Sequence, residues 1–290
     1  MSMSSKHVAF VSLRVAYEGQ TELLCGTVTE TFATGATEAD FSVELRQGML
    51  PPPPVGAELL QQTTDDVVYR SKDGWQRRFL ARYQGRCWEY ACVDYTDRSA
   101  VLTVAPDCSN VPHCVDSCTA FEHLALWADA LPLHASHIQL DGSAILFTAP
   151  CGVGKSTQAA LWQHHRGARI INGDKALLLC KNSPVYASGL PYSGTSGICE
   201  NAAAPLKAIV VLEQGKENVL TRLQGGKAVI RLMTGVICQS WHEGDREQAL
   251  SLAIRVAEQV PVFLLSCLPD ESAVLCLENA LQKLREGESL

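Results

Sequence analysis

Basic residues are in the minority in this chain, and long apolar runs are missing from it. Its 290 residues include 24 Lys and Arg against 31 Asp and Glu, for a net charge of −7. Non-specific binding to nucleic acid or to an anionic membrane surface needs a basic face, so we expect no nucleic-acid partner. No apolar run approaches the roughly 18 residues of a membrane span, so we expect no membrane partner either.

A secretion signal is also missing from the first residues. The segment Met1–Lys6 lacks the apolar stretch of a signal peptide, and we therefore expect a cytoplasmic protein. The rest of the composition, with 47% apolar and 19% charged residues, is ordinary for a globular protein. A chain of this length can form one large or two moderate domains with a sizeable core.

Cysteine, by contrast, is abundant, with 12 residues. Many lie within apolar runs, which is typical of reduced core cysteines in the cytosol. One cluster differs, because Cys108, Cys114 and Cys118 lie close to His113, and thiolate and imidazole are both zinc ligands. The spacing matches no common zinc motif, and no C-x-x-C pair occurs elsewhere. Unliganded thiols near a domain junction are therefore favoured, with zinc as the alternative.

The segment Ala144–Gln158 combines a short buried strand, a glycine-rich turn, a Lys-Ser pair and a helical pattern. This is the layout of a phosphate-binding loop. Glycines let the turn point its N–H groups at phosphate oxygens, and the helix N-terminus adds its positive end. Lys155 would contact the β- and γ-phosphates, and the Ser156 hydroxyl would hold Mg²⁺. The phosphate-binding residues predicted from this loop are Cys151, Gly152, Val153, Gly154, Lys155, Ser156 and Thr157.

The loop departs from the usual pattern at one position. That pattern opens with a glycine five residues before Gly154, and Ala149 stands there instead. Alanine can serve at this place if its φ is negative. A plain strand-to-helix turn with a solvated lysine is the alternative. It is less favoured because both the flanking strand and the flanking helix are present, as the motif requires.

The first hundred residues read as short strands separated by turns. Residues 7–104 contain several alternating or β-branched runs, one of them over residues 21–32. Turn signals stand at Lys72–Gly74 and at Gln84-Gly85. The pattern predicts a mainly antiparallel β domain, which we assign to residues 1–115. No catalytic constellation is visible in it.

From about residue 116 the pattern becomes a mixture of helices and strands. Helical spacing covers residues 118–131, and two consecutive strands then lead into the phosphate loop. Because this order is not a regular alternation of strands and helices, it predicts a mixed α/β domain over residues 116–290. Later helices are expected over residues 226–234, 245–259 and 271–284.

Three further features could serve phosphoryl transfer. Asp174 ends the strand after the phosphate-loop helix, where an Asp can bind a metal or accept a hydroxyl proton, although a surface turn is the alternative. His134 precedes the hairpin that leads into the loop, and the sheet could return it near the phosphates, although a lone His is more often structural. A loop of small and hydroxyl-bearing residues could approach phosphate or a peptide backbone, with a plain turn as its alternative. Its residues are Ser193, Gly194, Thr195, Ser196 and Gly197.

Taken together, these motifs resemble the HPr kinase/phosphorylase-like proteins, whose P-loop kinase core is related to that of phosphoenolpyruvate carboxykinase. The resemblance covers roughly residues 120–290. In that family a His lies one short hairpin ahead of the phosphate-loop Lys, and His134 lies 21 positions ahead of Lys155 (155 − 134). The family's next strand ends in Asp-Asp, whereas here it ends in Gly173-Asp174. The second Asp carries over to Asp174, and the first, the family's proton acceptor, is missing.

The family's Glu-x-Arg-Gly segment has no match around residues 189–197 either. The likeness is closer to a divergent branch found beside peptide-maturation enzymes, including kinases that phosphorylate a serine of a lasso-peptide precursor. The resemblance implies an ATP- and Mg²⁺-dependent kinase that acts on a serine of a peptide or small protein and forms a homo-oligomer. The alternatives are a nucleotide-binding regulatory module without phosphotransfer and a small-molecule kinase or carboxykinase-like enzyme.

Under the kinase interpretation, each feature has an expected role. Asp174, His134 and Lys155 would be the catalytic residues. Ser156 and Asp174 would hold Mg²⁺, and His134 or Asp174 would take the hydroxyl proton. The loop over residues 193–197 would line the acceptor side.

Overall fold

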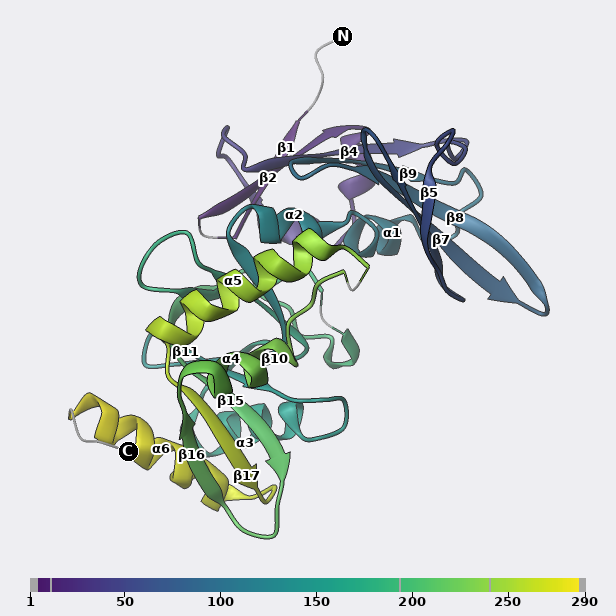
Figure 1. Cartoon of the computed structure of the whole chain (residues 1–290). Coiled ribbons are helices and arrows are strands. Elements are labelled where there is room, and N and C mark those ends of the chain that lie inside the picture. Colours follow the sequence, from purple (N-terminus) through teal and green to yellow (C-terminus); the bar gives the residue numbers. More distant parts are fainter. Residues whose placement is uncertain (1–4, 11, 193, 240, 287–290) are drawn as a thin grey trace. The chain divides into compact units, whose positions relative to one another are not determined.

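The computed structural model describes residues 5–10, 12–192, 194–239 and 241–286. These residues form two compact units (Figure 1). Unit 1 comprises Met1–Ala128 and Gln239–Asp245, and unit 2 comprises Asp129–Cys238 and Arg246–Leu290. Residues 116–128 and 239–245, which the sequence-based division assigned to the second domain, thus group with the first unit.

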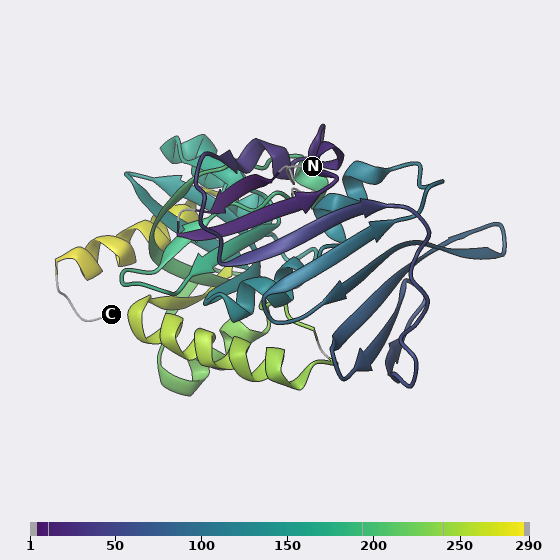
Figure 2. The same ribbon diagram turned by 90° about the horizontal axis from the view of Figure 1, so that it is seen from above.

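Unit 1 is built on a nine-stranded sheet with the strand order β3-β1-β2-β4-β9-β8-β7-β6-β5 (Figures 1 and 2). The β4 strand pairs in parallel with β2 and β9, and the remaining neighbours pair antiparallel. The expected β-rich N-terminal half is confirmed. The parallel pairing of β4 with β2 and β9 near the centre of the sheet was not predicted from the turn signals. The strands are β1 Lys6–Phe10, β2 Leu13–Gly19, β3 Ala33–Thr34, β4 Phe41–Gln47, β5 Glu58–Gln62, β6 Asp66–Ser71, β7 Gly74–Tyr83, β8 Arg86–Tyr95 and β9 Ser99–Val104.

The strand expected over residues 21–32 is wrong. This segment forms two 3₁₀ helices, η1 (Thr21–Leu24) and η2 (Thr29–Phe32). The Asp116 carboxylate accepts hydrogen bonds from the backbone N–H groups of Val28 and Thr29, each at 3.0 Å, and from the Thr29 hydroxyl at 2.6 Å. These bonds satisfy N–H groups at the start of η2, so the segment does not need a sheet partner.

The helix expected over residues 118–131 is shorter than the pattern indicated. The α2 helix covers Phe121–Trp127, and a second short helix, α1 (Val111–Ser117), precedes it. Asp129 adopts a φ of +59°, which ends the helix, and the chain then enters a strand at Ala130. The Phe121 ring packs on the rings of Phe10 and Phe41, at centroid distances of 5.3 and 6.0 Å, and so anchors α2 to the sheet.

Unit 2 has an eight-stranded sheet with the path β11-β10-β13-β14-β15-β17-β16, and β12 pairs with β10. Because β15 also pairs with β11, the first five strands of this path close into a ring. The strands β11, β15 and β17 run parallel, so their carboxyl ends meet at one edge. The strands are β10 Ala130–Leu140, β11 Ser143–Thr148, β12 Arg169–Asn172, β13 Lys175–Leu179, β14 Tyr186–Ser188, β15 Ala203–Gln214, β16 Val219–Leu223 and β17 Val262–Cys267.

Helix α3 directly follows the phosphate loop, which leads out of β11. It packs against β10, β11 and the C-terminal helix, and its buried Trp162 lies 6.4 Å from the Phe147 ring of β11 in the core. The N-terminus of α3 therefore stands directly beyond the end of β11. The helices expected from the sequence in this half are confirmed. They are α3 Lys155–Arg166, α4 Gly225–Met233, α5 Glu243–Gln259 and α6 Glu271–Arg285, and a 3₁₀ turn, η3, covers Gly194–Ser196.

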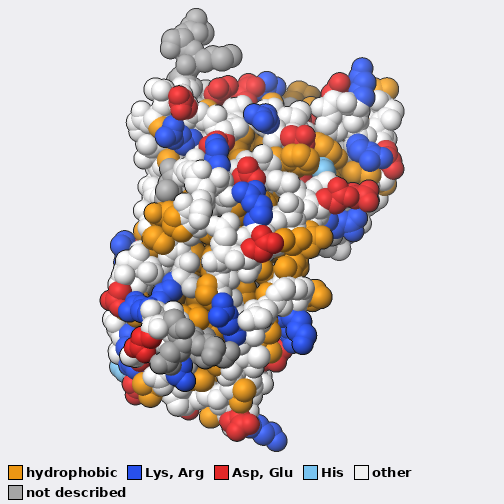
Figure 3. Space-filling model, turned by 60° about the vertical axis from the view of Figure 1, so that its left-hand side comes forward, with side chains coloured by type: hydrophobic (Ala, Val, Ile, Leu, Met, Phe, Trp, Pro, Cys, Tyr) orange, Lys and Arg blue, Asp and Glu red, His pale blue; other side chains and the backbone are white. Residues whose placement is uncertain are grey.

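The expected mixed α/β fold, with a β-rich first half and a P-loop core, is therefore confirmed. Within the described part of the chain, no helix combines the length and the apolarity needed to cross a membrane. On the face drawn in Figure 3, basic and acidic side chains are interspersed rather than gathered by sign.

Candidate functional site

The loop between β11 and α3 has the backbone of a phosphate-binding turn. Gly152 and Gly154 adopt φ values of +79° and +125°, a region that other residues avoid. A Cβ atom at either position would meet nothing within 4 Å, so the backbone, and not the available space, requires glycine there. Ala149 is buried and is not among the residues with positive φ, which explains why alanine serves in place of the usual glycine.

Lys155 starts α3 and turns back across the loop. Its Nζ donates hydrogen bonds to the carbonyl oxygens of Ala149 at 2.9 Å and Pro150 at 3.4 Å. Burial lowers the pKa of the Lys155 ammonium, and the negative charge of Asp174 opposes that shift. The first turn of α3 contains no acidic residue, and Ser156 and Thr157 are exposed on it. The positive end of the helix is therefore not neutralised and can receive an anion.

His134 and Asp174 lie side by side in the structure. His134 lies on β10, and its Nε2 is 3.2 Å from Asp174 Oδ1. Strand pairing produces this contact, because β10 pairs with both β12 and β13 and Asp174 lies between those two strands. The pKa of His134 is lowered by partial burial and by the charge of Lys155, while Asp174 opposes the shift. Three of the predicted residues thus act on one another electrostatically at one end of the sheet.

Asn172 holds the turn that carries Asp174. Its side chain is fully buried, and its Oδ1 accepts hydrogen bonds from the N–H groups of Asp174 and Lys175, both at 2.9 Å. Its Nδ2 donates to the carbonyl oxygens of Leu190 at 3.1 Å and Tyr192 at 2.6 Å. Asn172 was not among the site residues predicted from the sequence, although an Asn that opens an Asn-Gly-Asp turn is a known turn signal.

The loop after β14 lies against this turn. A Cβ atom on Gly194 would lie 2.8 Å from Cβ and Cγ of Asp174, so the Gly194 backbone is in close contact with that side chain. A Cβ atom on Gly173 would overlap the side chain of Ser196. Glycine at position 173 is therefore a steric requirement of the present loop position. Of the predicted loop residues, Ser193 and the side chain of Thr195 lie outside the described part of the structure.

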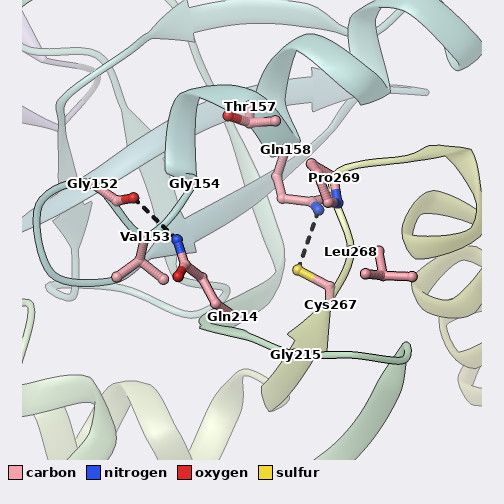
Figure 4. A pocket seen from close by; sticks show the side chains of 10 residues that line it. All are labelled: Gly152, Val153, Gly154, Thr157, Gln158, Gln214, Gly215, Cys267, Leu268 and Pro269. Atoms are coloured by element: carbon pink, nitrogen blue, oxygen red, sulfur yellow. Dashed lines mark hydrogen bonds between the residues drawn. The ribbon is translucent and has the colours of Figure 1, made fainter.

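A cavity of about 320 Å³ opens beside the phosphate loop (Figure 4). It lies at the carboxyl ends of the parallel strands β15 and β17, where open α/β sheets bind their ligands. Gln214 reaches from β15 to the Gly152 carbonyl at 3.5 Å, and Gln158 of α3 contacts the Cys267 sulfur at 3.4 Å. The lining residues are Gly152, Val153, Gly154, Thr157, Gln158, Gln214, Gly215, Cys267, Leu268 and Pro269.

Two residues that line this cavity, Gln214 and Cys267, were not among the site residues predicted from the sequence. Gln214 and Cys267 are the last residues of β15 and β17, and each lies more than 50 positions from the phosphate loop. Only the parallel pairing of the strands brings them there. A larger cavity of about 510 Å³ opens on another side of the loop, beside Cys151. It is bordered by the ion pair of Arg231 with Glu213, at 2.9 Å.

The cysteine cluster of unit 1 does not have the geometry of a metal site. Cys108 and Cys114 lie with their sulfurs 3.4 Å apart, but the ring of His113 faces the Ser117 hydroxyl instead. Burial raises the pKa of the Cys108 thiol. The pKa of the Cys114 thiol is also raised, first by its hydrogen bond with Cys118 and second by burial. In the described ranges, the group of His, Cys, Asp and Glu with metal-ligand proximity lies elsewhere.

The range matched in a comparison with known families includes most of the α/β unit that holds the candidate site. A family model described as "SynChlorMet cassette protein ScmC" matches residues 113–270, which is just over half of the chain. The chain belongs to this family. The matched range includes the phosphate loop, His134, Asp174 and the loop beside it, so the candidate site lies inside the part that defines the ScmC family.

Other comparisons add little to the family assignment. The search of curated proteins found no match. Among solved structures, the chain is similar to the Hpr(Ser) kinase/phosphatase from Coxiella burnetii, with 14% identity over 54% of this chain and 91% of that one. The TM-score of that superposition is 0.32, which is too low for an argument about the site.

Proposed function

We propose that this chain is an ATP- and Mg²⁺-dependent kinase that phosphorylates a serine hydroxyl of a peptide or small protein. The observation that carries the proposal is the approach of three groups to one another. They are the phosphate loop with Lys155, the His134–Asp174 pair, and the glycine- and serine-containing turn that contacts Asp174. A nucleotide site alone would need only the first of these groups.

Nucleotide binding is the task of the loop. The N–H groups around Gly152 and Gly154 and the uncompensated N-terminus of α3 favour phosphate oxygens. Lys155 now donates to two neutral carbonyl groups of its own loop. Hydrogen bonds to ionised phosphate are stronger than hydrogen bonds to such carbonyls. We therefore expect the Lys155 ammonium to turn toward the phosphates of a bound nucleotide.

A magnesium ion suits the oxygen donors near the loop. Mg²⁺ prefers hydroxyl, carboxylate and phosphate oxygens, and Ser156 and Asp174 supply the first two kinds. The ion would neutralise charge on the transferred phosphoryl group. Asp174 is about 29% exposed, so its carboxylate is accessible to a ligand.

Proton transfer from the acceptor hydroxyl falls to His134 in this proposal. Its lowered pKa keeps the imidazole neutral at pH 7, which is the form that can accept a proton. One ring nitrogen faces Asp174 at 3.2 Å, and the other remains for the hydroxyl. This arrangement replaces the missing carboxylate at Gly173, where no side chain fits beside Ser196.

A regulatory nucleotide-binding module is the second candidate, and Gly173 is the observation that favours it. If a carboxylate at that position is indispensable for transfer, the loop would bind nucleotide without using it. Two measurements separate the candidates, namely Mg-ATP binding by calorimetry and transfer of labelled γ-phosphate to a library of serine-containing peptides. Binding without transfer to any peptide supports the module.

The Lys155→Ala variant tests the kinase proposal itself. We expect transfer to fall by about 100-fold or more, because the phosphates lose a preorganised cation in the transition state. The exposed Lys181, on the turn after β13, offers a matched control, and Lys181→Ala should retain full activity. Circular dichroism and the unfolding midpoint must be unchanged in both variants. A correctly folded Lys155→Ala protein that still transfers phosphate at the normal rate contradicts the proposal.

A further inference from the structure

Unit 1 contains a buried cluster of ligating side chains that the proposed kinase chemistry does not use. It consists of His123 on α2 and of His242 and Asp245, where the chain enters α5. Their exposed fractions are 0%, 8% and 0%. About 120 residues separate the first from the other two, so no local motif announces the cluster.

Hydrogen bonds orient the three side chains but leave each of them incomplete. Asp245 Oδ1 lies 2.7 Å from His123 Nδ1 and accepts a hydrogen bond from Trp127 Nε1 at 3.1 Å. The backbone N–H of Asp245 donates to His242 Nδ1 at 2.9 Å. One nitrogen of each ring and one carboxylate oxygen are thereby engaged, and the rings are held in fixed orientations.

The remaining ligating atom of each side chain is buried without a hydrogen-bond partner. These atoms are His123 Nε2, His242 Nε2 and Asp245 Oδ2. A buried polar atom without a partner is unfavourable, and proteins rarely keep one without a reason. In this group, one ligating atom of each residue lies within 4.8 Å of those of the other two, and Asp245 Oδ1 lies 2.7 Å from His123 Nδ1 and 3.4 Å from His242 Nδ1.

A fourth candidate ligand approaches from the turn between β8 and β9. Asp97 Oδ1 lies 3.5 Å from His123 Nε2, which is too long for a good hydrogen bond. Two ligands on one tetrahedral ion, with bond lengths of about 2.0–2.2 Å, are separated by about 3.4 Å. Asp245 Oδ1, however, lies at the other nitrogen of the same ring, Nδ1, so an ion shared by His123 Nε2 and Asp97 would be out of reach of Asp245, and Asp97 is left outside the site.

The surroundings favour an ion over a plain histidine–carboxylate pair. The Trp75 and Tyr95 rings lie 4.3 Å from the His242 ring and 5.1 Å from the His123 ring, respectively, and exclude water. Burial lowers the pKa of His242, which keeps its imidazole in the neutral form that binds metals. A buried carboxylate needs a compensating positive charge, and a divalent cation would supply it.

We propose that His123, His242 and Asp245 bind a divalent metal ion, with zinc as the best match to this set of nitrogen and oxygen donors. Because the three side chains are buried and aromatic rings surround them, the ion would have a structural rather than a catalytic role. The ion would hold the segment over residues 239–245 to α2 within unit 1. This inference does not depend on the proposed kinase activity.

Metal content and coordination of the whole protein provide the first test. The purified chain should contain about one equivalent of zinc by mass spectrometry, or take it up after chelation and dialysis. X-ray absorption should show nitrogen and oxygen neighbours near about 2.0 Å and no sulfur near about 2.3 Å. A sulfur-dominated spectrum would assign the ion to cysteines and overturn the proposal, as would a protein that takes up no zinc.

Conservative variants provide the second test. His242→Gln and Asp245→Asn should each reduce bound zinc at least tenfold. A chelator should lower the thermal stability of the parent, and this effect should be absent in both variants. His113→Ala removes an exposed histidine of the same unit and should keep full zinc content, as should Lys155→Ala. If both cluster variants fail to fold, the zinc content and the X-ray absorption of the parent protein decide the proposal. Stoichiometric zinc in the folded variants would mean that the cluster is a histidine–carboxylate pair only.

Discussion

At the scale of single residues, the site depends on which side chain stands beside Asp174. His134 occupies that place, and its pKa is held below the ordinary histidine value of about 6.5 by burial and by Lys155. The protonated imidazole cannot accept a hydroxyl proton. If His134 is the base, activity should therefore be complete at neutral pH and should fall only when the pH drops through that lowered pKa.

The pH profile of the rate tests this assignment. We expect the acid limb of kcat/KM to lie below pH 6.5 (about the ordinary histidine value), and Asp174→Asn to move it to still lower pH, because Asp174 raises the pKa of His134. His134→Gln should lose this limb together with most of the activity. The exposed His164, on α3, offers a control, and His164→Gln should leave the profile unchanged. A limb that persists in the folded His134→Gln protein assigns the titration to another group.

Gly173 yields a second prediction at this scale. A Cβ atom there overlaps the side chain of Ser196, so Gly173→Ala should destabilise the protein by about 1–3 kcal/mol, the usual cost of overpacking. Removing the Ser196 side chain frees that space, and the double variant Gly173→Ala/Ser196→Gly should recover most of the loss. Urea unfolding of the parent, both single variants and the double variant gives the coupling energy. Additive effects would show that the two positions do not collide.

At the scale of elements, the segments whose interacting residues lie close together in the sequence were predicted correctly. Those whose partners lie far away in the sequence were not. The hairpin, turn and helix around Lys155 and the strand that leads to Asp174 were predicted correctly as elements, because their signals lie within about forty residues of one another. The strand expected over residues 21–32 was wrong because its β-branched composition was outweighed by Asp116, whose partners lie 87 and 88 positions away. The cavity wall at Gln214 and Cys267 was missed for the same reason, since parallel pairing joins segments distant in the sequence.

Asn172 shows how one side chain joins several elements. It binds the turn between β12 and β13 and also the segment that ends in Tyr192. Asn172→Ala leaves these buried groups without partners and should lower the free energy of unfolding by about 1–3 kcal/mol. It should also reduce transfer, because the Asp174 turn loses its support. Asn172→Asp keeps the acceptor atom and loses the donor, so comparing the two variants by urea unfolding and kinetics separates the two halves of the network.

At the scale of the whole molecule, the two proposed sites lie in different units. The phosphate loop, Lys155, His134 and Asp174 all belong to unit 2, and the buried histidine cluster belongs to unit 1. The cluster was invisible in the sequence because its members are about 120 residues apart, whereas the cysteine spacing that drew attention to residues 108–118 has no metal-site geometry. Ligands of the two sites should therefore protect different parts of the chain.

Hydrogen exchange can measure this separation. Mg-ATP at about 100 times its dissociation constant stabilises the state that binds it by about 2.7 kcal/mol. We expect slower exchange in the phosphate loop, the Asp174 turn and the ends of β15 and β17, which line the cavity. The strands of unit 1 should exchange as before, and Lys155→Ala should abolish the protection. Protection spread evenly over β1–β9 as well would show that nucleotide binding acts on both units, since local contact at the loop cannot slow exchange in a sheet that belongs to the other unit.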